Sequence, residues 1–191
     1  MKKILDPIAF YNDKKFLIFN LIFFGVGTLV SIFMRAWFDN TFHLSFRTEI
    51  NALNTFIENT FSVLLIMLAI FLCGKIINSK VRLIDCLNLS FYIRIPFYLL
   101  TLSNINGTFS GMLPTDVSSN VVNINLPTDS LDYTLLIVSS ILGLIIIVFQ
   151  LIAIYKGFKT LSNAKKVGHY LLLVSFIIVT IILSTYLFKK I

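Results

Sequence analysis

The sequence predicts an all-α integral membrane protein with five transmembrane helices, and three observations support this prediction. Of the 191 residues, 57% are hydrophobic and 13% are charged, whereas soluble domains contain about 45–50% apolar and about 25% charged residues. Five apolar runs approach the roughly 20 residues that a helix needs to cross a bilayer. Lysine and arginine are concentrated in alternate connections between these runs. Because backbone groups in lipid must form their hydrogen bonds internally, the runs are expected to be helices.

The predicted organisation is a short lead-in, residues 1–15, followed by a single five-helix domain, residues 16–191. The first apolar run exceeds the length of a signal-peptide core and no cleavage site follows it, so it is expected to be retained. The spans are expected at about 16–38, 60–77, 83–102, 133–155 and 169–188.

Two segments outside the spans have local patterns. The lead-in "ILDPIAFYNDKK" predicts a short amphipathic helix at the membrane interface, with Asp6 as its cap and Pro7 at its first position. An unstructured lead-in is the alternative. After the first span, "FHLSF" alternates as a strand does, and "VVNINL" in the third loop is a candidate partner. A helix from about Thr48 is expected to lie at the interface or to run into the second span.

The distribution of basic residues predicts the orientation. Eleven lysines and arginines lie in the N-terminal segment, the second loop and the fourth loop, whereas the third loop, residues 103–132, has none. Cytoplasmic loops carry such an excess, so the N-terminus is expected on the cytoplasmic side of the membrane. The basic residues flank apolar runs, so lipid rather than nucleic acid is the expected partner. The candidate contacts with anionic lipid are Lys14, Lys15, Lys80, Arg82, Lys165 and Lys166.

The third predicted span contains Arg94 near its centre and Pro96 two residues later. Arg94 lies about 16 Å into the helix, where an unpaired charge is costly. Pro96 removes a hydrogen bond to the carbonyl of Tyr92 and is expected to kink the helix. The expected acceptors for Arg94 are backbone carbonyls, hydroxyls, Asn20, Gln150 or an external anion. Both a structural clamp between helices and an anion or lipid-headgroup contact remain open.

Acidic partners for Arg94 are scarce in the sequence. Asp85 lies about 13 Å away on the same predicted helix and is expected to cap its start. Glu58 is expected near the outer end of the second span, and no other predicted span contains a carboxylate. The lack of a carboxylate partner is evidence against a proton relay.

Motifs of catalysis and cofactor binding are lacking. The sequence has no glycine-rich phosphate loop, no GxSxG and no HExxH. Cys73 and Cys86 are expected to be packing residues, and the two histidines, His43 and His169, have no zinc-ligand spacing. The protein is therefore expected to be no enzyme and to need no cofactor.

Three segments resemble the Yip1 domain, a family of five-span membrane proteins. "RLIDCLNLSFYIRIPFYLL" resembles the middle helix of that domain through Tyr92 and Pro96, although "IR" replaces its usual small polar residues. "LDPIAFY" resembles the lead-in of bacterial members, and this resemblance implies a bacterial inner membrane. The third segment, "YKGFKTLSNAKKVGHYLLLV", resembles the exit from the fourth helix through Gly157, Leu161, Ser162 and Ala164.

The resemblance implies five helices and a cytoplasmic N-terminus, but no reaction. The sequence contains no counterpart of the Asp-Leu-Tyr-Gly-Pro stretch of eukaryotic members, so binding of Rab-type GTPases is not expected. The leading hypothesis is a non-enzymatic scaffold that binds lipid, a membrane-protein partner or further copies of itself. The alternative is a small oligomeric transporter or channel in which Arg94 and Gln150 face an anionic or polar solute.

Overall fold

A computed structural model describes residues 2–47, 49–105, 107, 109 and 130–188. Five of its helical segments are long and apolar enough to cross a membrane, which confirms the predicted all-α membrane fold. These segments are Asp13–Phe33, Ala52–Ile77, Leu83–Asn104, Tyr133–Ser162 and Val167–Leu187.

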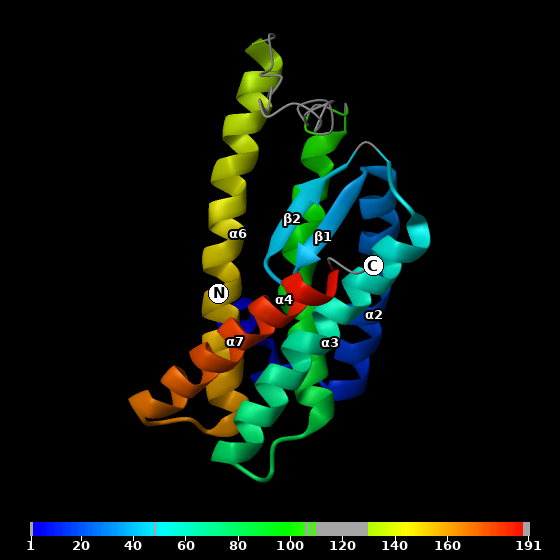
Figure 1. Cartoon of the computed structure of the whole chain (residues 1–191). Helices are drawn as coiled ribbons and strands as arrows, with labels where there is room; N and C mark the ends of the chain where they lie inside the picture. The colour runs from blue at the N-terminus through cyan, green and yellow to red at the C-terminus, as the bar shows by residue number, and fades with distance from the viewer. Residues whose placement is uncertain (1, 48, 106, 108, 110–129, 189–191) are drawn as a thin grey trace.

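The chain follows an up-and-down path (Figure 1). The elements are, in order, α1 (Lys2–Leu5), η1 (Pro7–Ala9), α2 (Asp13–Phe33), β1 (Ala36–Asn40), β2 (His43–Phe46), α3 (Ala52–Ile77), α4 (Leu83–Thr101), η2 (Leu102–Asn104), α6 (Ser130–Ser162) and α7 (Val167–Phe188).

Helix α4 is the central helix of the bundle and packs against α2, α3 and α6. Helix α7 lies obliquely across the bundle and packs against α3 and β1 (Figure 1). The main apolar core lies between α3, α4, α6 and α7, where Ile70, Leu89 and Phe158 are fully buried. The start of α2 lies at the same end as the α3–α4 and α6–α7 connections (Figure 1). We call this the basic end, because Lys14, Lys15, Lys75, Lys80, Lys165 and Lys166 are exposed there.

The first span is shorter than predicted. It was expected to reach residue 38, but α2 ends at Phe33 and Arg35 adopts a positive φ of 53°. The next residues form β1, which pairs with β2 in an antiparallel hairpin. Ala36, Trp37 and Phe38 are buried. An apolar run of this kind is compatible with a buried strand as well as a helix, which is why periodicity alone did not separate them.

The hairpin is a re-entrant element that folds back along the bundle (Figure 1). Its tip is closed by Asn40, whose Oδ1 accepts a 2.8 Å hydrogen bond from the backbone N–H of Phe42. Phe42 packs against the main core, and the Phe38 ring meets the Tyr98 ring edge-on at 6.1 Å. Non-helical backbone is tolerated at membrane depth where protein covers it. The strand predicted at "FHLSF" is confirmed, but its partner is β1, and "VVNINL" lies outside the described residues.

Helix α3 begins at Ala52 rather than at residue 60, so the helix predicted in the first loop runs into the second span. Asn51 caps it by accepting hydrogen bonds from the backbone N–H groups of Leu53 and Asn54. The longer helix includes Glu58 and Asn59, both fully buried. Glu58, expected near the outer end of the second span, thus lies within the helix that forms it.

Two further predictions change in detail. Helix α6 continues to Ser162, so Lys156 and Lys159 lie on a helix and not in the fourth loop. The lead-in forms α1 and η1 rather than one helix, although Pro7 does start η1. Asp6 does not cap η1, because its carboxylate accepts a hydrogen bond from the hydroxyl of Thr160 on α6.

Candidate functional site

Arg94 is buried inside the bundle, with 3% of its surface exposed. Its Nε donates a 3.0 Å hydrogen bond to Oδ1 of Asn59 on α3. Its Nη1 donates a 2.7 Å hydrogen bond to the carbonyl of Thr41 at the hairpin tip. The guanidinium also lies over the rings of Phe38, at 4.2 Å, and Phe97, at 5.3 Å. Two neutral acceptors and two aromatic faces thus surround the charge.

The amide of Asn59 extends this contact to two more groups. Its Nδ2 donates to Oγ1 of Thr28 on α2 at 2.7 Å and to the hydroxyl of Tyr98 on α4 at 2.9 Å. The hydroxyl of Thr28 in turn donates to the carbonyl of Phe24 at 2.7 Å. A buried polar network is stable when its members have partners. This network joins α2, α3, α4 and the hairpin, and the geometry favours the structural clamp over the anion contact.

The other residues predicted to share a site with Arg94 lie elsewhere. Gln150 on α6 donates a 2.7 Å hydrogen bond to the carbonyl of Ile93, close to Pro96. Asn20 on α2 donates to the backbone carbonyl and side-chain oxygen of Asn88 at 3.1 and 3.2 Å. Each amide ties a different helix to α4, which accounts for its burial in an apolar chain.

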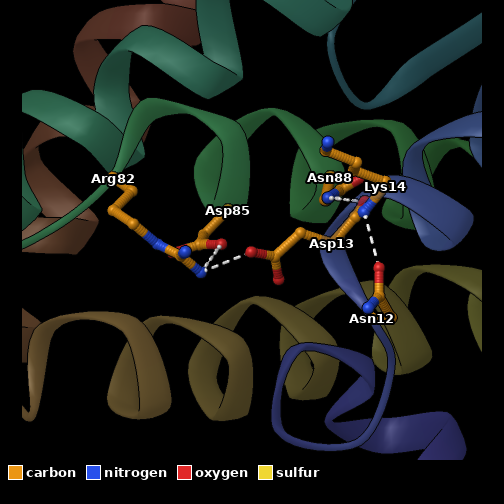
Figure 2. Close-up of polar contacts among 6 residues, drawn as sticks. All are labelled: Asn12, Asp13, Lys14, Arg82, Asp85 and Asn88. Atoms are coloured by element: carbon orange, nitrogen blue, oxygen red, sulfur yellow. Dashed lines mark hydrogen bonds and ion pairs between the residues drawn. The ribbon is translucent and has the colours of Figure 1, made fainter.

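A second polar network lies at the basic end (Figure 2). The guanidinium of Arg82 binds both carboxylate oxygens of Asp85 at 2.8 Å, and its Nη2 also lies 2.8 Å from Oδ2 of Asp13. The hydrogen bond and charge of Asp85, followed by the charge of Asp13, raise the pKa of Arg82. Nδ2 of Asn88 donates to the carbonyl of Asp13 at 3.2 Å, and Oδ1 of Asn12 caps α2.

This network changes two sequence interpretations. Arg82 was expected to contact anionic lipid, but its charge is balanced by two carboxylates of the chain. Asp85 lies in the first turn of α4 as expected, but it binds Arg82 rather than capping the helix. The sequence contained one signal for the network: residues 82, 85 and 88 have the three-residue spacing that brings side chains onto one helix face. Nothing in the spacing indicated Asp13, Asn59 or Thr41 as partners.

The N-terminal residues 2–12, which we call the N-terminal strap, attach to two helices. The hydroxyl of Tyr92 on α4 donates a 2.6 Å hydrogen bond to the carbonyl of Ile4. Asp6 binds Thr160 on α6. Tyr92 was grouped with Arg94 in the sequence, but its hydroxyl is directed to the strap.

A groove of about 390 Å³ lies between the strap, α2 and α4. Its lining consists of Ile4, Phe10, Tyr11, Asn12, Lys15, Phe16, Phe19 and Tyr92. The lining is largely aromatic and aliphatic, and Lys15 is its charged member. Of the predicted lipid contacts, Lys14, Lys15, Lys80, Lys165 and Lys166 are exposed.

Comparison with known proteins finds no match to this chain among family models, curated proteins or solved structures. Within the part of the chain that the structure describes, no group of three or more histidine, cysteine, aspartate or glutamate residues could hold a metal. Cys73 and Cys86 are both buried and form no disulfide. The candidate functional features are therefore the buried hydrogen-bond network around Arg94, which we call the clamp, the basic end and the groove.

Proposed function

We propose that the protein is a non-enzymatic membrane scaffold of the five-span, Yip1-like class that binds anionic lipid at its basic end. One observation carries the proposal: three separate segments carry exposed lysines. These segments are the start of α2 and the α3–α4 and α6–α7 connections, and they lie at one end of an apolar helix bundle (Figure 1). Each basic residue near an anionic membrane surface contributes about 1 kcal/mol of attraction. Lysines contributed by several segments therefore provide lipid binding without a dedicated motif.

The proposal includes an orientation. Basic residues concentrate on the cytoplasmic side of membrane proteins, which puts the basic end and the N-terminus in the cytoplasm. A bacterial cytoplasmic membrane supplies the anionic headgroups that these lysines would bind. The clamp around Arg94 supports a scaffold, because the guanidinium already binds Asn59 and the hairpin tip.

The test is lipid selectivity of the purified protein in detergent. Native mass spectrometry would compare the retention of phosphatidylglycerol and phosphatidylcholine, lipids of equal chain length. We expect the wild-type chain to retain the anionic lipid preferentially, and a variant with glutamine at five exposed lysines to lose that preference. The substituted lysines are Lys14, Lys15, Lys80, Lys165 and Lys166.

Arg35→Gln is the matched control, because Arg35 is exposed and lies outside the basic end. It should retain the wild-type preference. An unchanged preference in the five-lysine variant would contradict lipid binding at the basic end. Equal retention of both lipids by the wild-type chain would also contradict lipid binding at the basic end.

A transporter or channel for an anionic solute is the second candidate, and one observation favours it. Nη2 of Arg94 is buried and has no hydrogen-bond partner among the residues that the structure describes. A transported anion would be a suitable acceptor. A measurement of anion flux in liposomes separates the two functions. The scaffold proposal predicts no flux. Flux through the wild-type protein that is abolished in Arg94→Lys would overturn the scaffold proposal.

A further inference from the structure

The groove under the N-terminal strap has an aromatic wall. The ring of Phe16 is stacked with that of Tyr11 at 5.3 Å and lies 5.7 Å from that of Tyr92. Phe19 continues the wall one turn further along α2, 6.4 Å from Phe16. Phe16 is buried, whereas Phe19 is 44% exposed. The wall therefore begins at the strap and opens sideways along the surface of a membrane-spanning helix.

The polar rim of the groove is cationic. Lys15 lines it, and no carboxylate of the described residues pairs with this lysine. The nearest acid in the sequence, Asp13, binds Arg82 at 2.8 Å instead. Asn12 completes the rim, and its Oδ1 is used to cap α2. The rim thus presents an unbalanced positive charge beside an apolar surface.

The position of the groove matches the boundary between headgroups and hydrocarbon. Lys15 lies in the first turn of α2, which is the first helix long and apolar enough to span the membrane. At this depth a bilayer offers a phosphate immediately above an acyl chain. Ligand pockets are commonly about 300–1,000 Å³, so a groove of about 390 Å³ accommodates part of a lipid.

We propose that this groove binds one anionic phospholipid, whose phosphate pairs with Lys15 and whose acyl chain lies along Phe10, Phe16 and Phe19. The proposal rests on the proposed lipid-binding function and assigns it a site. The positive charge of the rim favours an anionic headgroup, and the aromatic wall favours an acyl chain. The hydrogen bond from Tyr92 to Ile4 holds the strap that forms the outer wall.

The chain contains a matched pair of lysines for the test. Lys14 and Lys15 are adjacent and exposed, but only Lys15 is among the residues that line the groove. Titration with phosphatidylglycerol, followed by native mass spectrometry, would measure the affinity of the first bound lipid. We expect Lys15→Gln to weaken it about five-fold, as the loss of one phosphate contact implies. Lys14→Gln should weaken it less than about two-fold, and Lys15→Arg should restore wild-type affinity.

The apolar part of the site has its own variant. Phe10 is 51% exposed, so Phe10→Ser should leave the fold intact while it weakens binding of the lipid. Glycerol phosphate, which carries the headgroup chemistry without a chain, should not displace the bound lipid. Displacement by glycerol phosphate would overturn the proposal in favour of a simple phosphate site.

Three outcomes would count against this inference, and the first of them distinguishes it from the proposed function. Equal weakening by Lys14→Gln and Lys15→Gln would overturn the groove as the site, while lipid binding at the basic end would stand. A five-lysine variant with undiminished preference for phosphatidylglycerol would overturn both. If phosphatidylcholine bound the groove as tightly as phosphatidylglycerol, the role of Lys15 would be excluded.

Discussion

Arg94 shows how a single charge is accommodated inside an apolar bundle. The guanidinium binds the amide of Asn59 and the carbonyl of Thr41, and it stacks on two rings. Aromatic faces attract a cation most strongly where water is excluded. Arg94 thereby holds the hairpin tip against α3 and α4, and its removal would leave the buried acceptors without a donor.

We predict that Arg94→Ala lowers the free energy of unfolding by about 2–4 kcal/mol, because it leaves two buried acceptors unsatisfied. Arg94→Lys should have an intermediate effect, because an ammonium cannot reproduce both bonds and the stacking. Unfolding in detergent, followed by circular dichroism, would measure the change. The exposed Arg35→Ala should change stability by less than about 0.5 kcal/mol. Equal stability of Arg94→Ala and wild type would contradict the clamp.

The ion pairs of Arg82 are expected to contribute little. Its side chain is 59% exposed and that of Asp13 is 38% exposed. Exposed ion pairs contribute about 0–1 kcal/mol and are screened by salt. We predict that a double-mutant cycle with Arg82→Gln and Asp13→Asn gives a coupling free energy below about 1 kcal/mol that falls at high salt. A larger coupling that is insensitive to salt would show that the pair is shielded from water.

The pH dependence of this contact follows from the raised pKa of Arg82. Because the pKa is raised, the stabilisation is complete at pH values below the ordinary pKa of arginine. It is lost only as the pH rises through the pKa in the folded state. Arginine is charged throughout the neutral range. Titration of Arg82 is therefore expected to leave stability unchanged across neutral pH, which thermal unfolding at several pH values would check.

At the scale of elements, helices α2 and α4 approach closely because Gly27 has no side chain. A β-carbon at Gly27 would overlap the ring of Tyr98. Tyr98 must keep this position, since its hydroxyl accepts a hydrogen bond from Asn59 and its ring packs against Phe38. At Gly25, two residues earlier, an added β-carbon would point into open space.

We predict that Gly27→Ala destabilises the protein by about 1–3 kcal/mol, because the added methyl overfills the α2–α4 contact. Gly25→Ala is the control and should be neutral or slightly stabilising, since alanine favours the helix. Thermal unfolding of both variants in the same detergent would compare them. Equal changes in stability for the two substitutions would contradict a close contact between α2 and α4 at Gly27.

At the scale of the whole molecule, exposed lysines are concentrated at one end of the bundle. The basic end contains the exposed lysines of α2, the α3–α4 connection and the α6–α7 connection. The opposite end receives the start of α3, with exposed Glu49 shortly before it. Since Cys73 and Cys86 are both completely buried, a cysteine introduced at either end would be the accessible thiol among the described residues.

We predict that a membrane-impermeant maleimide labels Glu49→Cys in intact cells. Lys80→Cys and Lys165→Cys should be labelled only after the membrane is permeabilised, as a cytoplasmic basic end requires. The wild-type chain provides the background. The reverse pattern of labelling would place the N-terminus outside and contradict the orientation.

The sequence could predict the features that depend on composition and local chemistry. Apolar length and scarce charge predicted five spanning helices, which the structure confirms. The third span was predicted most accurately, because the basic loop before it and the polar loop after it mark its ends. The strand at "FHLSF" was also predictable, because alternation is a local signal.

The tertiary structure decided which polar groups meet. Arg94 and Thr41 are separated by 53 positions in the chain, and no local pattern encodes their contact. The sequence grouped Arg94 with Asn20, Gln150 and Tyr92 because all are polar groups in apolar runs, yet each binds a different partner. An apolar run after Phe33 satisfied the rule for a helix, but packing against α3 and α7 made it a buried strand. Composition therefore determined that the chain belongs in a membrane, whereas long-range packing determined the clamp, the hairpin and the groove, since contacts between distant residues exist only in the folded bundle.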